Sequence, residues 1–168
     1  KLKPKSILIA VPSLSLVGQT LEVWARESVA KKMDIRWICV CSDQSVKDKT
    51  YDDPSISKND IGIDVKTNCS EISKWLTKET GLTNVIFTTY QSGPTITSAL
   101  KQCGLSVDFG IFDEAHKTVG SKNKLFAHLL DDSNIRIKRR LFMTATERRY
   151  LGNSEEILSM DDAKIYGK

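Results

Sequence analysis

Short apolar runs alternate with stretches of helical periodicity along most of this chain. Strands are predicted at the apolar runs Ser6–Val11, Ile35–Val40, 84–89, Phe109–Phe112 and 139–146. Helices are predicted where apolar residues recur on one face, at Leu14–Ala30, 69–80, 95–103 and 124–130. Strands that alternate with helices in this way predict an α/β domain, with a parallel sheet flanked by helices.

Two segments lack this patterning. Residues 42–66 are polar and rich in Asp, Lys and Ser, and a loop of that length is uncommon unless it is functional or disordered. The chain is also polar and weakly patterned from Glu147 onward. We therefore predict one domain over residues 1–150, followed by a polar tail at 151–168 that leads to the next domain.

Composition changes this picture only a little. The net charge of +4 and pI near 8.8 allow a nucleic-acid partner without requiring one. No apolar stretch approaches the roughly 20 residues of a membrane span, so no membrane partner is expected. The four cysteines include no C-x-x-C pair, which favours reduced thiols in a cytoplasmic protein and argues against zinc. The basic stretch at 135–140 is interpreted as a solvated edge in preference to a phosphate-binding patch.

The most informative apolar run ends in two adjacent carboxylates, in Phe109-Gly110-Ile111-Phe112-Asp113-Glu114-Ala115-His116. Chemistry in parallel sheets gathers at the carboxyl ends of the strands. Two acids in series there fit a site for Mg²⁺ and a nucleotide, with one carboxylate holding the metal and the next polarising a water. The alternative is that these residues only open a solvated helix.

A second apolar run, 139–146, ends in Thr144-Ala145-Thr146. In order and spacing, the two runs resemble motifs II (Walker B, in its DEAH spelling) and III of superfamily 2 helicases. The resemblance implies that Asp113 holds Mg²⁺ through water, and that Glu114 orients and activates the water that attacks ATP. It implies that His116 and the hydroxyls of Thr144 and Thr146 couple the nucleotide site to the interdomain cleft. A helix cap would also explain Thr146.

Two further segments resemble the same family. Val11-Pro12-Ser13-Leu14 is similar to motif Ia, and Phe87-Thr88-Thr89-Tyr90-Gln91 is similar to the Thr-Thr-Tyr segment between motifs Ia and II. The resemblance implies that Ser13, Thr89 and Gln91 contact the backbone of a bound nucleic-acid strand, which positions a strand without reading its sequence. Ser13 also fits a simple helix N-cap.

Motif I of the family, G-x-x-x-x-G-K-(S/T), does not occur in the sequence. By the resemblance, the chain is therefore an incomplete first RecA-like domain (motifs Ia to III) that lacks its first strand and phosphate-binding loop. We expect a fragment of a larger ATP hydrolase, itself inactive, and we expect the absent strand to lie beside the 109–112 strand. Exposed strand edges allow self-association.

The flanks of motifs II and III are similar to those of bacterial restriction-associated helicases, the type ISP and other type I-like restriction-modification enzymes. This similarity implies ATP and Mg²⁺ as cofactors, double-stranded DNA as the track, and the remainder of the parent polypeptide as a partner. Two alternatives remain: an RNA helicase of the DEAH type, and a non-catalytic nucleic-acid-binding module on a degenerate helicase domain.

Overall fold

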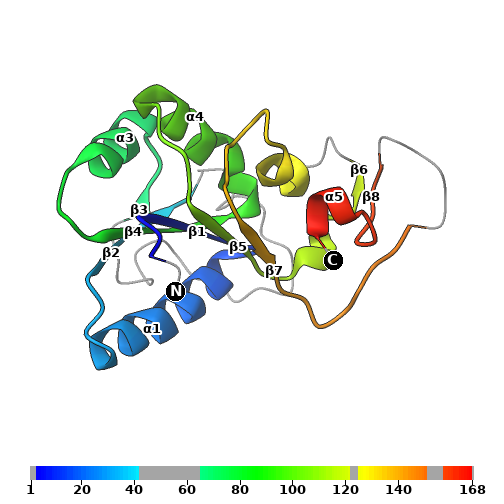
Figure 1. The fold of residues 1–168 in the computed structure, drawn as a ribbon, viewed down its shortest axis with the longest axis horizontal. Helices are drawn as coiled ribbons and strands as arrows, with labels where there is room; N and C mark the ends of the chain where they lie inside the picture. Colours follow the sequence, from blue (N-terminus) through cyan, green and yellow to red (C-terminus); the bar gives the residue numbers. More distant parts are fainter. Residues whose placement is uncertain (1–2, 42–64, 122–124, 151–156, 168) are drawn as a thin grey trace.

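A six-stranded parallel sheet runs through the computed structural model, which describes residues 3–41, 65–121, 125–150 and 157–167 (Figure 1). Its strands are β1 (Ser6–Val11), β2 (Ile35–Val40), β3 (Val65–Lys66), β4 (Thr83–Thr89), β5 (Phe109–Phe112) and β7 (Arg140–Phe142). They lie in the order β3-β2-β4-β1-β5-β7, and each pairing is parallel. The predicted α/β fold with a parallel sheet is confirmed.

Helices cover both faces of this sheet. They are α1 (Leu14–Ala30), α3 (Cys69–Thr77), α4 (Gly93–Cys103) and α5 (Ala163–Tyr166), with 3₁₀ helices η2 (Tyr90–Ser92), η3 (Ala115–Thr118) and η4 (Leu125–Leu130). Helix α1 lies on one face and α3 and α4 on the other (Figure 1). Along β1, Leu8 and Ala10 join the core cluster that includes residues of α3 and α4, whereas Ile7 and Ile9 join the cluster that includes residues of α1. This alternation explains why β1 is apolar throughout.

Local sequence signals set most helix ends where they were predicted. The Ser13 hydroxyl accepts the Leu16 N–H at 3.4 Å, so Ser13 is the N-cap of α1. Gly104, at φ +66°, ends α4 in the left-handed conformation that glycine favours. Helix α3 stops at Thr77, earlier than the predicted residue 80. The segment predicted as a helix at 124–130 forms the tighter 3₁₀ helix over its described part.

Both poorly patterned segments contain structure that the sequence did not predict. Val65–Lys66, at the end of the predicted polar loop, forms β3 beside β2, and residues 42–64 lie outside the described residues. In the predicted tail, β8 (Ile157–Leu158) pairs antiparallel with β6 (Gly120–Ser121). Leu158 is only 3% exposed and belongs to the same core cluster as Leu8. Such short elements carry too few residues to show a period.

The sheet order contradicts the prediction that a strand outside this sequence lies beside the 109–112 strand. Strand β5 already pairs with β1 on one side and β7 on the other, so no further strand can lie beside it. The sheet's end strands are β3 and β7. The predicted strand at 139–146 forms only over Arg140–Phe142, and its Leu141 is 44% exposed because β7 lies at the edge of the sheet.

Cys39, in β2, and Cys41, just after it, belong to the same core cluster, with their Sγ atoms 3.6 Å apart, and all four cysteines are free thiols. Within the described ranges, no cluster of three or more Cys, His, Asp or Glu side chains could hold a metal ion. No described helix is both long and apolar enough to cross a membrane.

Candidate active site

The predicted site residues lie at one edge of the sheet because the parallel strands that carry them end side by side. In the sheet register Val11 pairs with Thr89, and Phe112 pairs with Phe142. The residues that follow these strand ends include Ser13 after β1, Gln91 after β4, Asp113 after β5 and Thr144 after β7. The structure therefore brings the candidate residues to one edge, around the turn at 113–116, which we call the acidic turn.

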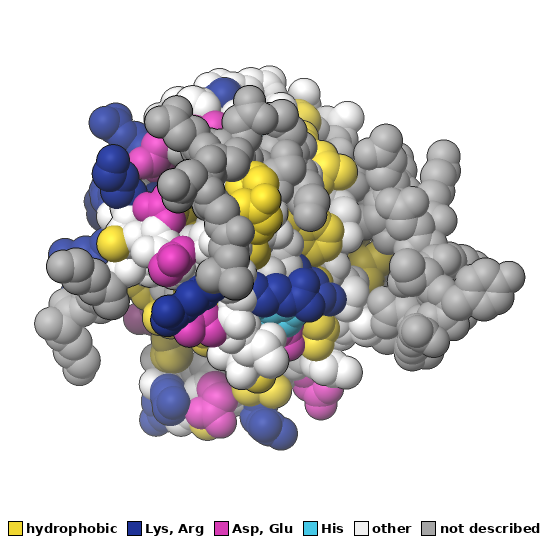
Figure 2. Space-filling model, turned by 90° about the vertical axis from the view of Figure 1, so that its right-hand side faces the viewer, with side chains coloured by type: hydrophobic (Ala, Val, Ile, Leu, Met, Phe, Trp, Pro, Cys, Tyr) yellow, Lys and Arg dark blue, Asp and Glu magenta, His cyan; other side chains and the backbone are white. Residues whose placement is uncertain are grey.

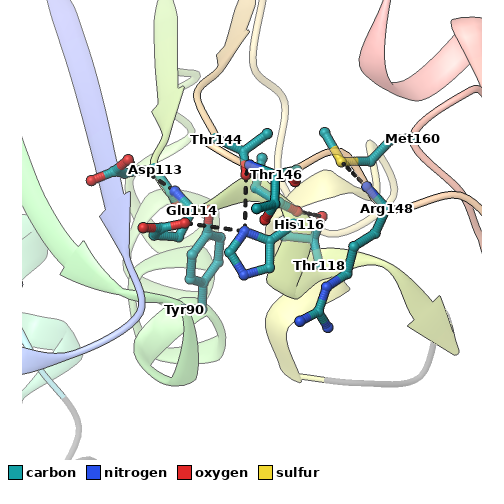
Figure 3. Close-up of polar contacts among 10 residues, drawn as sticks. Tyr90, Asp113, Glu114, His116, Thr118, Thr144, Thr146, Arg148 and Met160 are labelled. Atoms are coloured by element: carbon teal, nitrogen blue, oxygen red, sulfur yellow. Dashed lines mark hydrogen bonds and ion pairs between the residues drawn. The ribbon is translucent and has the colours of Figure 1, made fainter.

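Three hydrogen bonds from three different strand ends fix the acidic turn. Figure 3 shows its residues Asp113, Glu114 and His116 beside Tyr90 and Thr144. The Asp113 N–H donates to the Ala10 carbonyl at 3.0 Å, and the Ala115 N–H donates to the Met143 carbonyl at 2.9 Å. The hydroxyl of Tyr90 donates to the Asp113 carbonyl at 2.8 Å. The turn is thus tied to β1, to the end of β7 and to the segment after β4, and its position depends on the whole sheet.

Glu114 has a strained backbone. Its φ is +50° and its ψ is +44°, in the left-handed region, which costs roughly 1–2 kcal/mol for a residue with a Cβ atom. The Asp113 Oδ1 atom accepts the Glu114 N–H at 2.9 Å and offsets part of this cost. Such outliers persist only where the surroundings determine them, and they concentrate at functional sites.

His116 joins the acidic turn to the end of β7. Its Nδ1 lies 2.9 Å from the Thr144 Oγ1 and 3.1 Å from the Glu114 Oε2. The Thr144 hydroxyl donates its one proton to the Thr146 carbonyl at 2.9 Å, so toward His116 it can only accept. An ionised carboxylate is also only an acceptor. The geometry therefore assigns the proton to Nδ1, and this N–H is shared between Thr144 and Glu114.

Burial keeps the tyrosine behind the acidic turn neutral. Tyr90 is fully buried between Phe112 and Phe126, whose rings stack on it with centroids 6.4 Å and 5.2 Å away. This burial, with the nearby charges of Asp113 and Glu114, raises the pKa of the Tyr90 hydroxyl above its usual value. Tyr90 therefore stays a proton donor to the turn at neutral pH.

One carboxylate of the acidic turn fits an Mg²⁺ site. Mg²⁺ keeps several of its waters and is usually held by one or two carboxylates together with substrate phosphates. Asp113 is half-buried and spends one oxygen on the Glu114 N–H. Asp113 is thus the residue that would hold it.

The three residues predicted to contact nucleic acid differ in how they are presented. The Ser13 hydroxyl caps α1 and lies 2.9 Å from the Ser15 hydroxyl. Thr89 is 1% exposed, and its hydroxyl lies 2.8 Å from the hydroxyl of Ser92. Gln91 is half-buried, and its Oε1 has no hydrogen-bond partner among the described residues.

The basic residues around β7 form ion pairs with nearby acids. Lys138 pairs with Asp108 at 2.6 Å, and Arg140 pairs with Asp132. Figure 2, which views the side of the molecule where α5 and β8 lie, shows basic and acidic side chains interspersed. The interpretation as a solvated edge therefore fits Lys138, whose side chain is 63% exposed, but not Arg140, whose side chain is 16% exposed.

Sequence reasoning missed three residues that hold the site, Tyr90, Thr118 and Tyr166. Tyr90 lies inside the Thr-Thr-Tyr segment, but only its neighbours Thr89 and Gln91 were assigned a role from the sequence. The Thr118 hydroxyl donates to the Ala115 carbonyl at 2.7 Å and lies 2.7 Å from the Tyr166 hydroxyl. No sequence signal joins Thr118 to Tyr166, because their contact depends on how the chain returns to the sheet.

Comparison with known proteins adds the family context. No protein-family profile and no curated protein matches the chain. The ATP-dependent type ISP restriction-modification enzyme LlaBIII bound to DNA is similar at 29% identity and a TM-score of 0.73. A nuclease-deletion mutant of the type ISP enzyme LlaGI, in complex with a DNA substrate mimic, is similar at 30% identity and a TM-score of 0.68. Each match covers 99% of this chain, but only 11% and 15% of those longer chains, respectively.

Proposed function

This chain belongs to the superfamily 2 helicases, as a first RecA-like domain, and we propose that it drives ATP-dependent movement on double-stranded DNA within a restriction-modification enzyme. The observation that carries the proposal is the acidic turn at the carboxyl end of β5, where the strained Glu114 contacts His116, and His116 contacts Thr144. The chain is also similar to two type ISP enzymes, one ATP-dependent and bound to DNA and the other in complex with a DNA substrate mimic, and this similarity supports the same function.

The acidic turn supplies the residues for hydrolysis in this proposal. Bound ATP with Mg²⁺ supplies the phosphoryl group that is transferred to water. Asp113 would hold the Mg²⁺ ion, which would stabilise the charge that develops on the phosphates. Glu114, which is 37% exposed and backed by the His116 N–H, orients the attacking water and takes its proton. The His116 N–H, 3.1 Å from the Glu114 Oε2 atom, holds the Glu114 carboxylate in a fixed orientation.

The coupling and the DNA contacts follow from the same edge of the sheet. His116 and Thr144 transmit the state of the acidic turn to the end of β7, and the backbone of Thr146 supports the Thr144 hydroxyl from the other side. Ser13 and Gln91 contact the sugar-phosphate backbone of the DNA. Thr89 contributes to the same surface mainly by fixing the turn that carries Gln91, because its own hydroxyl lies against Ser92.

The phosphates of ATP need a cradle of backbone N–H groups and a lysine, and the sequence has no G-x-x-x-x-G-K-(S/T) loop to supply them. We therefore propose that the full-length protein supplies this loop and a second RecA-like domain, and that these 168 residues alone hydrolyse ATP negligibly. Strand β7 lies at the edge of the sheet, and its Leu141 is 44% exposed. This edge is the surface on which the rest of the full-length protein, or a second copy of the chain, would pack. We place the protein in the cytoplasm.

ATPase activity of the full-length protein tests the proposal, measured with and without double-stranded DNA. We expect stimulation by DNA, and we expect Glu114→Gln to abolish turnover because the amide cannot accept the proton of the water. Glu27→Gln is the matched control, since Glu27 lies on α1 and pairs with Lys31 in an exposed ion pair. It should keep the wild-type rate.

The alternatives give different results in the same assay. Stimulation by RNA in place of DNA would identify an RNA helicase. DNA binding without ATP turnover, in both the wild type and Glu114→Gln, would identify a non-catalytic binding module. Either result would overturn the proposed motor function.

A further inference from the structure

The C-terminal segment of the chain packs directly against the residues that follow the acidic turn. Strand β8 pairs with β6, and α5 follows β8 (Figure 1). The ring of Tyr166, at the end of α5, lies 4.9 Å from the ring of Phe142 in β7. The segment 157–167 therefore contacts both the end of β7 and the chain just beyond the acidic turn.

A relay of two hydroxyls connects this segment to the acidic turn. Thr118 is fully buried, and its hydroxyl donates its one proton to the Ala115 carbonyl at 2.7 Å. The Tyr166 hydroxyl, 2.7 Å from the same oxygen, must therefore be the donor to Thr118. Burial raises the pKa of the Tyr166 hydroxyl, which keeps its proton in place at neutral pH.

The relay acts on the part of the turn that is strained. Ala115 directly follows Glu114, whose φ is +50°. The Ala115 N–H is held by the Met143 carbonyl, and the Ala115 carbonyl is held by Thr118. Both polar groups of the residue after Glu114 are thus fixed, one by the end of β7 and the other by the relay. A strained backbone conformation persists only when contacts with the surrounding residues hold it in place.

We propose that Tyr166 is a positioning residue: through Thr118 and Ala115 it holds Glu114 in its left-handed conformation and joins the C-terminal segment to the acidic turn. The kinetic part of this inference rests on the proposed function, because it assumes that Glu114 activates the attacking water. The structural part stands on the hydrogen bonds alone.

The test uses the full-length protein with Tyr166→Phe, which removes the hydroxyl and keeps the ring against Phe142. Tyr150→Phe is the matched control, since Tyr150 is an exposed tyrosine that takes no part in the relay. Thr118→Val is a second variant that removes the relay from its other end. Hydrogen–deuterium exchange of the peptide spanning 113–119 is measured for each, beside ATPase kinetics with DNA.

We expect Tyr166→Phe to speed exchange of the 113–119 peptide by about five-fold, the effect of one typical buried hydrogen bond. Exchange in β1 and β4 should not change. We expect kcat to fall by a similar factor, with the KM for ATP unchanged, because a misplaced Glu114 affects hydrolysis and not binding. Thr118→Val combined with Tyr166→Phe should be no worse than the more severe single variant.

Equal exchange and equal kcat in Tyr166→Phe and Tyr150→Phe would overturn the inference, provided that Glu114→Gln is inactive. A rise in KM and a fall in kcat, together with faster exchange throughout the sheet, would also overturn it, since this would show general loss of structure. If exchange rises only at 113–119 but Glu114→Gln retains full activity, the positioning contact is supported and the proposed function fails.

Discussion

The Nδ1 atom of His116 lies 2.9 Å from the hydroxyl oxygen of Thr144, although 28 positions separate the two residues in the chain. The contact joins the turn after β5 to the end of β7. Because the Thr144 proton goes to the Thr146 carbonyl, His116 is the donor in this pair. A single hydrogen bond therefore links the residue beside the proposed base to the neighbouring strand.

Replacing Thr144 should weaken coupling more than replacing Thr146 does. Thr144→Val removes the acceptor for His116, whereas the described contacts of Thr146 with Thr144 use only its backbone. We expect Thr144→Val to reduce DNA-stimulated ATPase activity several-fold and to lower the free energy of unfolding by about 1 kcal/mol.

Thr146→Val is the matched control and should leave both quantities close to wild type. DNA-stimulated rates and urea denaturation measure the pair. An equal loss in the two variants would contradict the assignment of the coupling contact to the Thr144 hydroxyl.

The left-handed backbone at Glu114 gives a prediction on stability. Glycine adopts positive φ without a steric penalty, and alanine does not. Both Glu114→Gly and Glu114→Ala remove the carboxylate that contacts His116, so their difference isolates the backbone term. We expect the glycine variant to unfold with a free energy about 1 kcal/mol higher than the alanine variant.

Chemical denaturation of the two variants measures this difference, and both should be inactive as ATPases. If the alanine variant were as stable as the glycine variant, the backbone at Glu114 would not be strained.

Two glycines should respond to alanine with opposite signs. A Cβ atom on Gly110 would lie 2.9 Å from the Phe112 ring and 3.1 Å from the Ile137 Cγ2 atom, so Gly110→Ala should destabilise the fold by about 1–3 kcal/mol. Gly18 lies in α1, and a Cβ atom there would meet no described atom within 4 Å beyond its own stretch of helix. Gly18→Ala should therefore stabilise the fold by about 0.5–1 kcal/mol. Thermal melts of the two variants measure the signs, and the same sign in both would be inconsistent with the packing described.

Asp108 should make the fold sensitive to acid. Its carboxylate accepts a hydrogen bond from Lys138 at 2.6 Å and from the Lys5 and Ser6 N–H groups at 2.8 and 3.2 Å. These bonds, that from Lys138 above all, lower the pKa of the Asp108 carboxyl below its usual value. Because the folded-state pKa is lowered, this contribution is present above the unfolded pKa of about 3.9 and is lost as pH falls through the folded value.

We expect Asp108→Asn to lose about 1 kcal/mol at pH 7 and to differ less from wild type below about pH 3. Asp34→Asn, at an exposed carboxyl, is the control and should follow the wild-type curve. Free energies of unfolding across this pH range measure the effect. A constant difference at every pH would show that Asp108 acts by shape and not by charge.

The sequence by itself determined the strands and helices with long patterns. Ser6–Val11, Leu14–Ala30 and Ile35–Val40 form as predicted, because a run buried on both faces and a one-sided apolar stripe each leave a clear period. The resemblance to motifs II and III also implied that His116 and the Thr144 hydroxyl are coupled, and the two lie 2.9 Å apart. The superfamily followed from the order of these motifs.

Only the tertiary structure decided what depends on neighbours distant in the chain. A further strand was wrongly predicted beside β5, which β1 and β7 flank, because strand order leaves no trace in the residues of a single strand. The left-handed backbone at position 114 is not predictable from the sequence, because the residue there is glutamate and not glycine. The proton of His116 is assigned to Nδ1 by the Thr144 hydroxyl, which follows another strand. Thr118 and Tyr166 meet because β6 and β8 pair, and two-residue strands are too short to show a period of their own.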